Sequence, residues 1–131
     1  MSGTVSLISS AAITQEELVA FLRVVGAVTN PDEVFDGRLS KGEGNVWIVL
    51  DNSEQYFEPH VAWSVAQKLG GDPRTTIVIE IGNAPESRQL AAEFACAFAK
   101  NWPCVVYDLV DTVYSAQELL ELCRTGKCFN G

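Results

Sequence analysis

The sequence has few of the residues, and none of the motifs, that common catalytic and nucleotide-binding sites require. Histidine occurs once in the 131 residues, as His60, so a Ser–His or Cys–His pair would depend on that residue alone. No serine lies in a G-x-S-x-G elbow, and neither G-x-x-x-x-G-K nor G-x-G-x-x-G is present. We therefore expect no nucleophile of these kinds, no nucleotide-binding loop and no bound cofactor.

Closely spaced metal ligands and long apolar runs are also missing. None of the four cysteines, Cys96, Cys104, Cys123 and Cys128, forms a C-x-x-C pair, so we expect reduced, partly buried thiols and no zinc site. No stretch approaches the roughly 18 apolar residues of a membrane span. The first ten residues lack the basic start and the long apolar run of a signal peptide. These features predict a cytoplasmic protein that does not enter a membrane.

Basic residues are scarce. Asp and Glu number 17 against 9 Lys and Arg, which gives a formal net charge of −8. Such a chain is repelled by nucleic acid and by anionic membranes, and it is attracted to a basic partner. The simpler interpretation, which stays open, is that the charge keeps the protein in solution.

The apolar residues that are present predict a single domain, residues 1–131, in which strands and helices alternate. Capping boxes at Thr14 and Ser115 indicate two helix starts. We expect strands over residues 4–9, 33–39, 45–51, 75–82 and 104–107, and helices over residues 14–26, 59–69, 83–102 and 115–126. This order, β-α-β-β-α-β-α-β-α, predicts an α/β (or α+β) fold: a mixed β-sheet of about five strands with helices on both faces. The first six elements have the ferredoxin-like order, and a flavodoxin-like sheet is the alternative.

Two of these segments carry more detailed expectations. The strand over residues 45–51 is apolar on both sides, so we expect helices to cover both of its faces. The helix over residues 59–69 is expected to bury Val61, Val65 and Leu69 together with Ala62 and Ala66. Glu80 is unusual within an apolar strand, and we expect it near a sheet edge or beside a basic partner.

Aspartates follow two of the expected strands. Asp51 ends the strand over residues 45–51, and Asp108 and Asp111 follow the strand over residues 104–107. If the two strands are parallel neighbours, the carboxylates meet at one sheet edge, where Mg²⁺ could be held for phosphoryl transfer or hydrolysis. Aspartate at a strand end is also common turn chemistry.

Two stretches without a lysine or arginine, from Lys41 to Lys68 and from Lys100 to Arg124, contain both acids and tyrosines. If the loops in these stretches share a side of the molecule, they form one acidic face with aromatic anchors, which suits a basic protein partner. The alternative is a solvated face with Phe57 packed inward. The candidate partner-binding residues are Asp51, Glu54, Tyr56, Phe57, Glu58, Tyr107, Asp108, Asp111 and Tyr114.

The C-terminal part of the chain has a recognisable order of elements. A helix leads through Trp-Pro to a short strand, an acidic turn, Val-Tyr and a final helix, in the segments LAAEFACAFA (residues 90–99), WPCVV (102–106) and VYSAQELL (113–120). This pattern resembles small bacterial immunity proteins, which are encoded beside polymorphic or contact-dependent growth-inhibition toxins. The resemblance implies a non-enzymatic inhibitor that binds a cognate toxin domain in the cytoplasm of the producing cell. Many such toxins are basic nucleases.

The leading hypothesis is therefore a toxin-neutralising immunity protein that is not an enzyme. Two alternatives stay open from the sequence. One is the Mg²⁺-dependent enzyme built on Asp51, Asp108 and Asp111. The other is a protein-binding adaptor unrelated to toxins.

Overall fold

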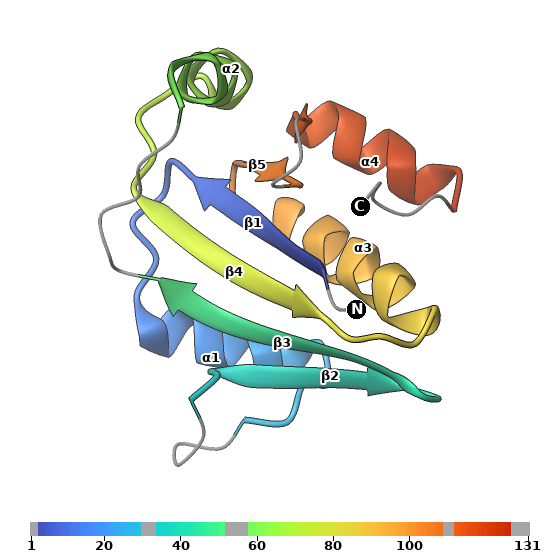
Figure 1. Cartoon of the computed structure of the whole chain (residues 1–131). Helices are drawn as coiled ribbons and strands as arrows, with labels where there is room; N and C mark the ends of the chain where they lie inside the picture. The colour runs from blue at the N-terminus through green and yellow to red at the C-terminus, as the bar shows by residue number, and fades with distance from the viewer. Residues whose placement is uncertain (1–2, 30–33, 52–57, 109–111, 127–131) are drawn as a thin grey trace.

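The computed structural model describes residues 3–29, 34–51, 58–108 and 112–126, and its centre is an antiparallel sheet. The sheet has six strands in the order β2-β3-β4-β1-β5-β6 (Figure 1). Every pair of neighbouring strands is antiparallel. The strands are β1 (Gly3–Ser9), β2 (Gly37–Lys41), β3 (Gly44–Asp51), β4 (Thr75–Ile81), β5 (Cys104–Tyr107) and β6 (Val113–Tyr114).

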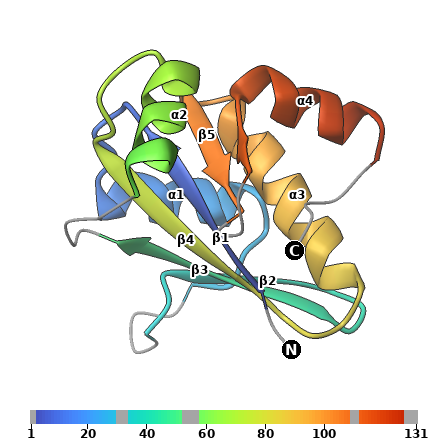
Figure 2. The same ribbon diagram turned by 45° about the horizontal axis from the view of Figure 1, so that its top comes forward.

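The described residues form four helices, three on one face of the sheet and one on the other. They are α1 (Gln15–Val24), α2 (Pro59–Leu69), α3 (Glu86–Ala99) and α4 (Ala116–Arg124). The buried residues of α1, α3 and α4 join one large core with one face of the sheet, whereas those of α2 join a small core on the other face. Figure 2 shows α2 on its own side of the sheet. The expected combination of one sheet with helices on both faces is confirmed.

The structure adds a strand and changes the strand order. β6 is only two residues long, too short to show a period in the sequence, and it pairs with β5. All pairings are antiparallel, where a mixed sheet was expected. The ferredoxin-like arrangement is wrong, because β4 lies between β3 and β1 and pairs with β3 directly. The order of helices and strands along the chain was thus predicted more accurately than the order in which the strands pair in the sheet.

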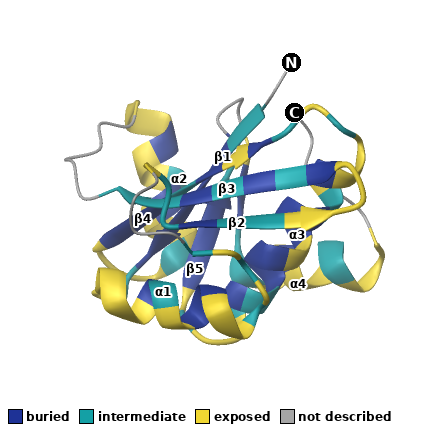
Figure 3. Cartoon of the chain, turned by 90° about the horizontal axis from the view of Figure 1, so that it is seen from below, coloured by how far each residue is buried: buried dark blue, intermediate teal, exposed yellow. Residues whose placement is uncertain are grey.

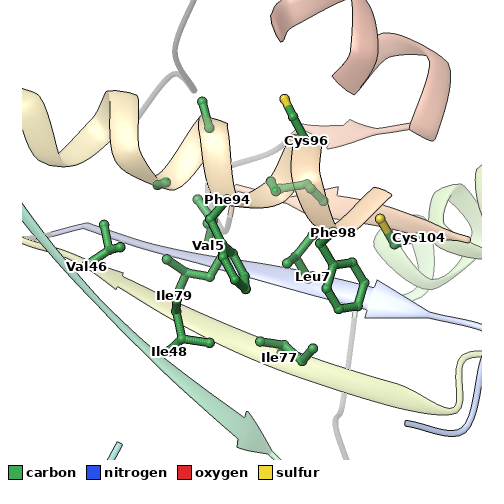
Figure 4. Close-up of a cluster of buried hydrophobic side chains, with 14 of the residues drawn as sticks. Val5, Leu7, Val46, Ile48, Ile77, Ile79, Phe94, Cys96, Phe98 and Cys104 are labelled. Carbon is green, nitrogen blue, oxygen red and sulfur yellow. The ribbon is translucent and has the colours of Figure 1, made fainter. Parts of the chain in front are cut away.

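The large core is built from alternate residues of the strands and from the aromatic side of α3. Ile77 and Ile79 of β4 are fully buried beneath Phe94 and Phe98 (Figure 4). Phe21 of α1 contacts both phenylalanines, with ring centroids 5.7 and 5.9 Å away. Since a buried aromatic side chain contributes more apolar area than any aliphatic one, these rings account for much of the stability of the fold.

Both capping boxes predicted from the sequence are present. The N–H of Glu17 donates to the Thr14 hydroxyl, and the N–H of Glu118 donates to the Ser115 hydroxyl. In each case the glutamate carboxylate accepts a hydrogen bond from the backbone N–H of the capping residue. These local contacts need no tertiary structure, which is why the sequence shows them.

The start of α3 approaches the sheet unusually closely. The N–H of Asn45 donates to the hydroxyl of Ser87, 2.9 Å away, and Ser87 is fully buried. A Cβ atom on Gly44 would lie 2.8 Å from the carbonyl carbon of Glu86, closer than real Cβ contacts. Glycine at position 44 is therefore required because the backbone of α3 occupies the space of a side chain.

We predict that Gly44→Ala lowers the free energy of unfolding by about 1–3 kcal/mol, because either α3 or the β2–β3 turn must shift. Gly3→Ala is the matched control, since a Cβ there meets nothing within 4 Å. The control should change the free energy of unfolding by no more than about 0.5 kcal/mol. Denaturant unfolding followed by circular dichroism measures both, and equal stabilities would contradict the proposed close packing.

A disulfide between Cys96 of α3 and Cys123 of α4 overturns the expectation of reduced thiols at these positions. Their Cα atoms are 6.4 Å apart and 27 positions apart in sequence. Only helix packing brings them together, so spacing alone could not reveal the pair. Cys104 is a free cysteine, and burial raises the pKa of its thiol to about 12, so it is a poor nucleophile.

We predict that Cys123→Ser lowers the free energy of unfolding under non-reducing conditions by about 3–4 kcal/mol, the loop-closure value for a loop of this length. The wild-type protein in reductant should fall to nearly the same stability as the variant. Denaturant curves with and without reductant test this. A variant as stable as the oxidised wild type would contradict it.

Candidate protein-binding surface

The side of α2 that faces away from the sheet is exposed, and apolar residues there lie among His60, Gln67 and Lys68. Val61 and Val65 are buried on Ile8 of β1, Val105 of β5 and Val113 of β6. Trp63 lies between the two valines in sequence, two positions from each, so it projects from another side of the helix and is 66% exposed. We call Pro59, Ala62, Trp63 and Ala66, all exposed, the α2 outer surface; Figure 3 distinguishes the exposed and buried parts of the helix.

This exposure corrects the predicted buried stripe of the helix. Ala62 and Ala66 were expected to be buried with the valines, but both are exposed. The core beneath α2 is small, so it covers only a narrow stripe of the helix. Sequence reasoning also missed Trp63 as a candidate binding residue. The available signal was a large aromatic residue that lies off the i, i+4 stripe of Val61 and Val65.

One acidic residue, Glu58, adjoins the start of α2, and a second, Asp51, lies farther away on the sheet. Glu58 immediately precedes α2 and is exposed, and its carboxylate lies 3.8 Å from Nδ1 of His60. Asp51 is the last residue of β3 and is half-buried. Its side chain is on the same sheet face as α2, because Asp51 pairs with Thr76, which pairs with Ile8 of the small core. The carboxylate of Glu58 also suits the positive end of the helix dipole.

Lys68 holds the C-terminal end of α2 against the last helix. Its Nζ donates to the carbonyl of Val113 at 2.6 Å and to Oε1 of Glu118 at 2.7 Å. The hydrogen bond from Lys68, followed by that from the Ser115 backbone, lowers the pKa of Glu118. Lys68 therefore links α2, β6 and α4 and fixes the direction in which the α2 outer surface points.

The two candidate tyrosines do not share a surface. In the pairing of β5 with β6, Tyr107 is opposite Val113 and Val106 is opposite Tyr114. Tyr107 is half-buried beside the small core under α2, whereas Tyr114 is buried in the large core. Tyr107 is thus on the same sheet face as α2, and Tyr114 points to the opposite face.

Asp108 has the role of a turn residue. It is only 4% exposed, and its Oδ1 accepts a hydrogen bond from the N–H of Thr112 at 3.0 Å. Its own N–H donates to the carbonyl of Thr112 at 3.1 Å. Asp108 therefore stabilises a turn, which was the alternative to a metal site in the sequence analysis.

The proposed meeting of strand-end aspartates is wrong for Asp51 and Asp108. β3 and β5 run in opposite directions and are separated by β4 and β1, so their C-terminal ends are not neighbours. Three strand spacings alone place the two strands roughly 14 Å apart. Among the described residues, no three His, Cys, Asp or Glu side chains are grouped as metal ligands. The geometry that motivated the Mg²⁺-dependent enzyme is thus absent for this pair.

The remaining candidates lie outside the described residues: Glu54, Tyr56, Phe57 and Asp111.

On α4, a groove lined by Tyr114, Glu118, Glu121 and Leu122 contains two of the acids of the second base-free stretch. Glu118 pairs with Lys68, and Glu121 pairs with Arg124, so this groove carries less net charge than the sequence pattern suggests.

Comparison of the chain with protein-family models, curated proteins and solved structures finds no match. The resemblance to immunity proteins therefore stays a prediction from the C-terminal pattern. In the described parts of the chain, no helix is long and apolar enough to span a bilayer.

We predict that Glu118→Gln lowers the free energy of unfolding at neutral pH by at most about 1 kcal/mol, as expected for an exposed ion pair. Because the pKa of Glu118 is lowered in the folded state, the carboxylate stabilises the protein above its unfolded-state pKa. That contribution is lost as the pH falls through the folded-state pKa. Unfolding curves over an acidic pH series should show the difference between wild type and variant shrinking. A difference independent of pH would contradict the assignment.

Proposed function

We propose that the protein is an immunity protein that neutralises a cognate toxin domain by binding it. Three features support the proposal: the C-terminal resemblance, the net charge of −8, and an exposed tryptophan on a helix that begins beside Glu58. None of these requires a catalytic residue or a cofactor. An inhibitor of this kind acts in the cytoplasm of the producing cell, so we propose that location as well.

The observation that carries the proposal is the exposure of Trp63. Tryptophan is among the residues that most often dominate binding energy at protein interfaces. Trp63 is 66% exposed, and its neighbours one helical turn away are the exposed residues Pro59, His60, Ala66 and Gln67. This exposure leaves the indole accessible to a pocket of a partner.

The acidic stretch that leads into α2 indicates which partner this surface suits. Asp51 and Glu58 belong to the stretch from Lys41 to Lys68 that contains no lysine or arginine between its ends. A basic toxin domain, such as a nuclease with a positively charged substrate cleft, would be attracted by this charge and would associate faster. The apolar α2 outer surface would then supply contact area.

The Cys96–Cys123 disulfide bears on the proposed location. Disulfides persist mainly in oxidising compartments, and cytoplasmic thiols are kept reduced. In the cytoplasm, α4 would be held by its buried residue Leu119 and by Lys68 rather than by the disulfide.

The test is binding to a toxin domain encoded by a neighbouring gene. We predict a tight complex on co-expression, and we predict that Trp63→Ala raises its dissociation constant by about 30-fold or more, the effect of losing an interface hot spot. Glu58→Lys should slow association, most strongly at low salt. Calorimetry and stopped-flow kinetics measure the two effects.

Val24→Ala is the matched control, because Val24 is 82% exposed on α1, far from α2 in the fold. It should leave the affinity unchanged. If no neighbouring toxin domain binds, the immunity function is wrong. If a complex forms but Trp63→Ala binds normally, immunity stands and the α2 outer surface is not the contact.

A further inference from the structure

The sheet face that α2 occupies is only partly covered. α2 contacts Ile8, Val105 and Val113, which belong to β1, β5 and β6. Over β2, β3 and β4, no helix in the described part of the chain covers this face, contrary to the expectation that both faces of β3 would be covered. The residues of this open sheet face are Val28, Phe35, Arg38, Ser40, Asn45, Trp47, Val49, Asp51, Thr76, Val78 and Glu80.

The centre of the open sheet face is apolar and partly exposed, and its two ends are polar, with Ser40 and Asn45 at one end and Asp51 and Thr76 at the other. Trp47, Val49 and Val78 are partly exposed, and the ring of Phe35 lies 6.3 Å from that of Trp47. Val28, bridged to Arg38 at the outer side of β2, is 57% exposed. Contiguous apolar side chains on a sheet surface mark an interaction site more often than they mark a solvated face.

Two opposite charges flank the centre of this face. Arg38, Trp47 and Glu80 are cross-strand partners on β2, β3 and β4, so the arginine and the glutamate lie on either side of the indole. They are two strand spacings apart, about 10 Å. Nε of Arg38 is buried without a hydrogen-bond partner among the described residues, and Glu80 is exposed with no ion pair there. Glu80 thus lies neither at a sheet edge nor beside a basic partner, against both expectations for it.

We infer that the open sheet face binds a second copy of this chain, with the two sheets face to face across a two-fold axis that runs along β3. That axis places Trp47 against its own copy and moves each Arg38 over the Glu80 of the partner. Each copy then supplies the charge that the other lacks, which is the self-complementarity that an isologous interface requires. The strands of the two sheets would run nearly parallel or antiparallel, as in aligned sheet packing.

The position of α2 is compatible with this arrangement. α2 stands over β1, β5 and β6, on one side of β3 only. Rotation about an axis along β3 therefore carries each α2 beyond the β2 edge of the other copy. The helices flank the paired sheets and do not separate them.

The charges favour a second copy over a basic protein at this face. A basic partner could pair with Glu80 and Asp51 but would be repelled by Arg38, whereas a second copy pairs Arg38 with Glu80. The inference does not depend on the proposed function, because the α2 outer surface and the open sheet face contain no residue in common.

The test uses the full chain and two charge reversals. We predict that the wild type is a dimer of the 14.2 kDa chain in sedimentation velocity at micromolar concentration. Glu80→Arg alone and Arg38→Glu alone should each raise the dissociation constant at least about 100-fold, because the axis creates two like-charged contacts in either variant. Mixing the two variants should restore dimers, since in the mixed dimer both contacts again join opposite charges.

Glu16→Arg is the matched control, an exposed charge reversal on α1 that should leave the dimer intact. Circular dichroism confirms that each variant folds, and restored dimers in the mixture exclude unfolding as the cause of dissociation. A monomeric wild type, or a mixture that stays monomeric, would overturn the inference. Trp63→Ala should dimerise normally, so loss of toxin binding and loss of the dimer can be told apart.

Discussion

The packing of α3 across the middle of the sheet is the contact on which the rest of the structure depends. Phe94 and Phe98 are buried against β1 and β4, and the start of the helix is fixed to β3 by the hydrogen bond between Asn45 and Ser87. α4 is in turn held on α3, through Leu119 and the Cys96–Cys123 disulfide. This side of the sheet has α1, α3 and α4, so among the helices of the described residues α2 alone lies on the other face.

This unequal distribution explains why surfaces for binding are found on the α2 side. One helix cannot cover a sheet of six strands, so within the described residues no helix covers β2, β3 and β4 on this face, and side chains such as Trp47 and Val49 are partly exposed. The same helix has a narrow buried stripe, so Trp63 remains outside. The α2 outer surface and the open sheet face thus have the same cause: a single described helix packs on this face of the sheet, over a small core.

Features that depend on neighbouring residues were predictable from the sequence, and features that depend on strand pairing were not. The capping boxes at Thr14 and Ser115 and the alternation in β4 are local patterns, and the structure confirms them. The sequence did not show that β4 pairs with both β1 and β3, and the expectation that Asp51 and Asp108 meet failed for that reason. The interpretation of Asp108 as a turn residue needed only its contact with Thr112, four positions away, and it was confirmed.

The thin core beneath α2 has a consequence for local stability. The helix is held by Val61 and Val65, by the partly buried Leu69, and by the hydrogen bonds of Lys68, whereas α3 contributes most of its length to the large core. Cooperative units with little buried apolar surface open at a fraction of the free energy of global unfolding. The backbone amides of α2 therefore exchange with solvent through detachment of the helix while the sheet and α3 stay folded. Binding of a partner at Trp63 would therefore slow hydrogen exchange at the backbone amides of α2.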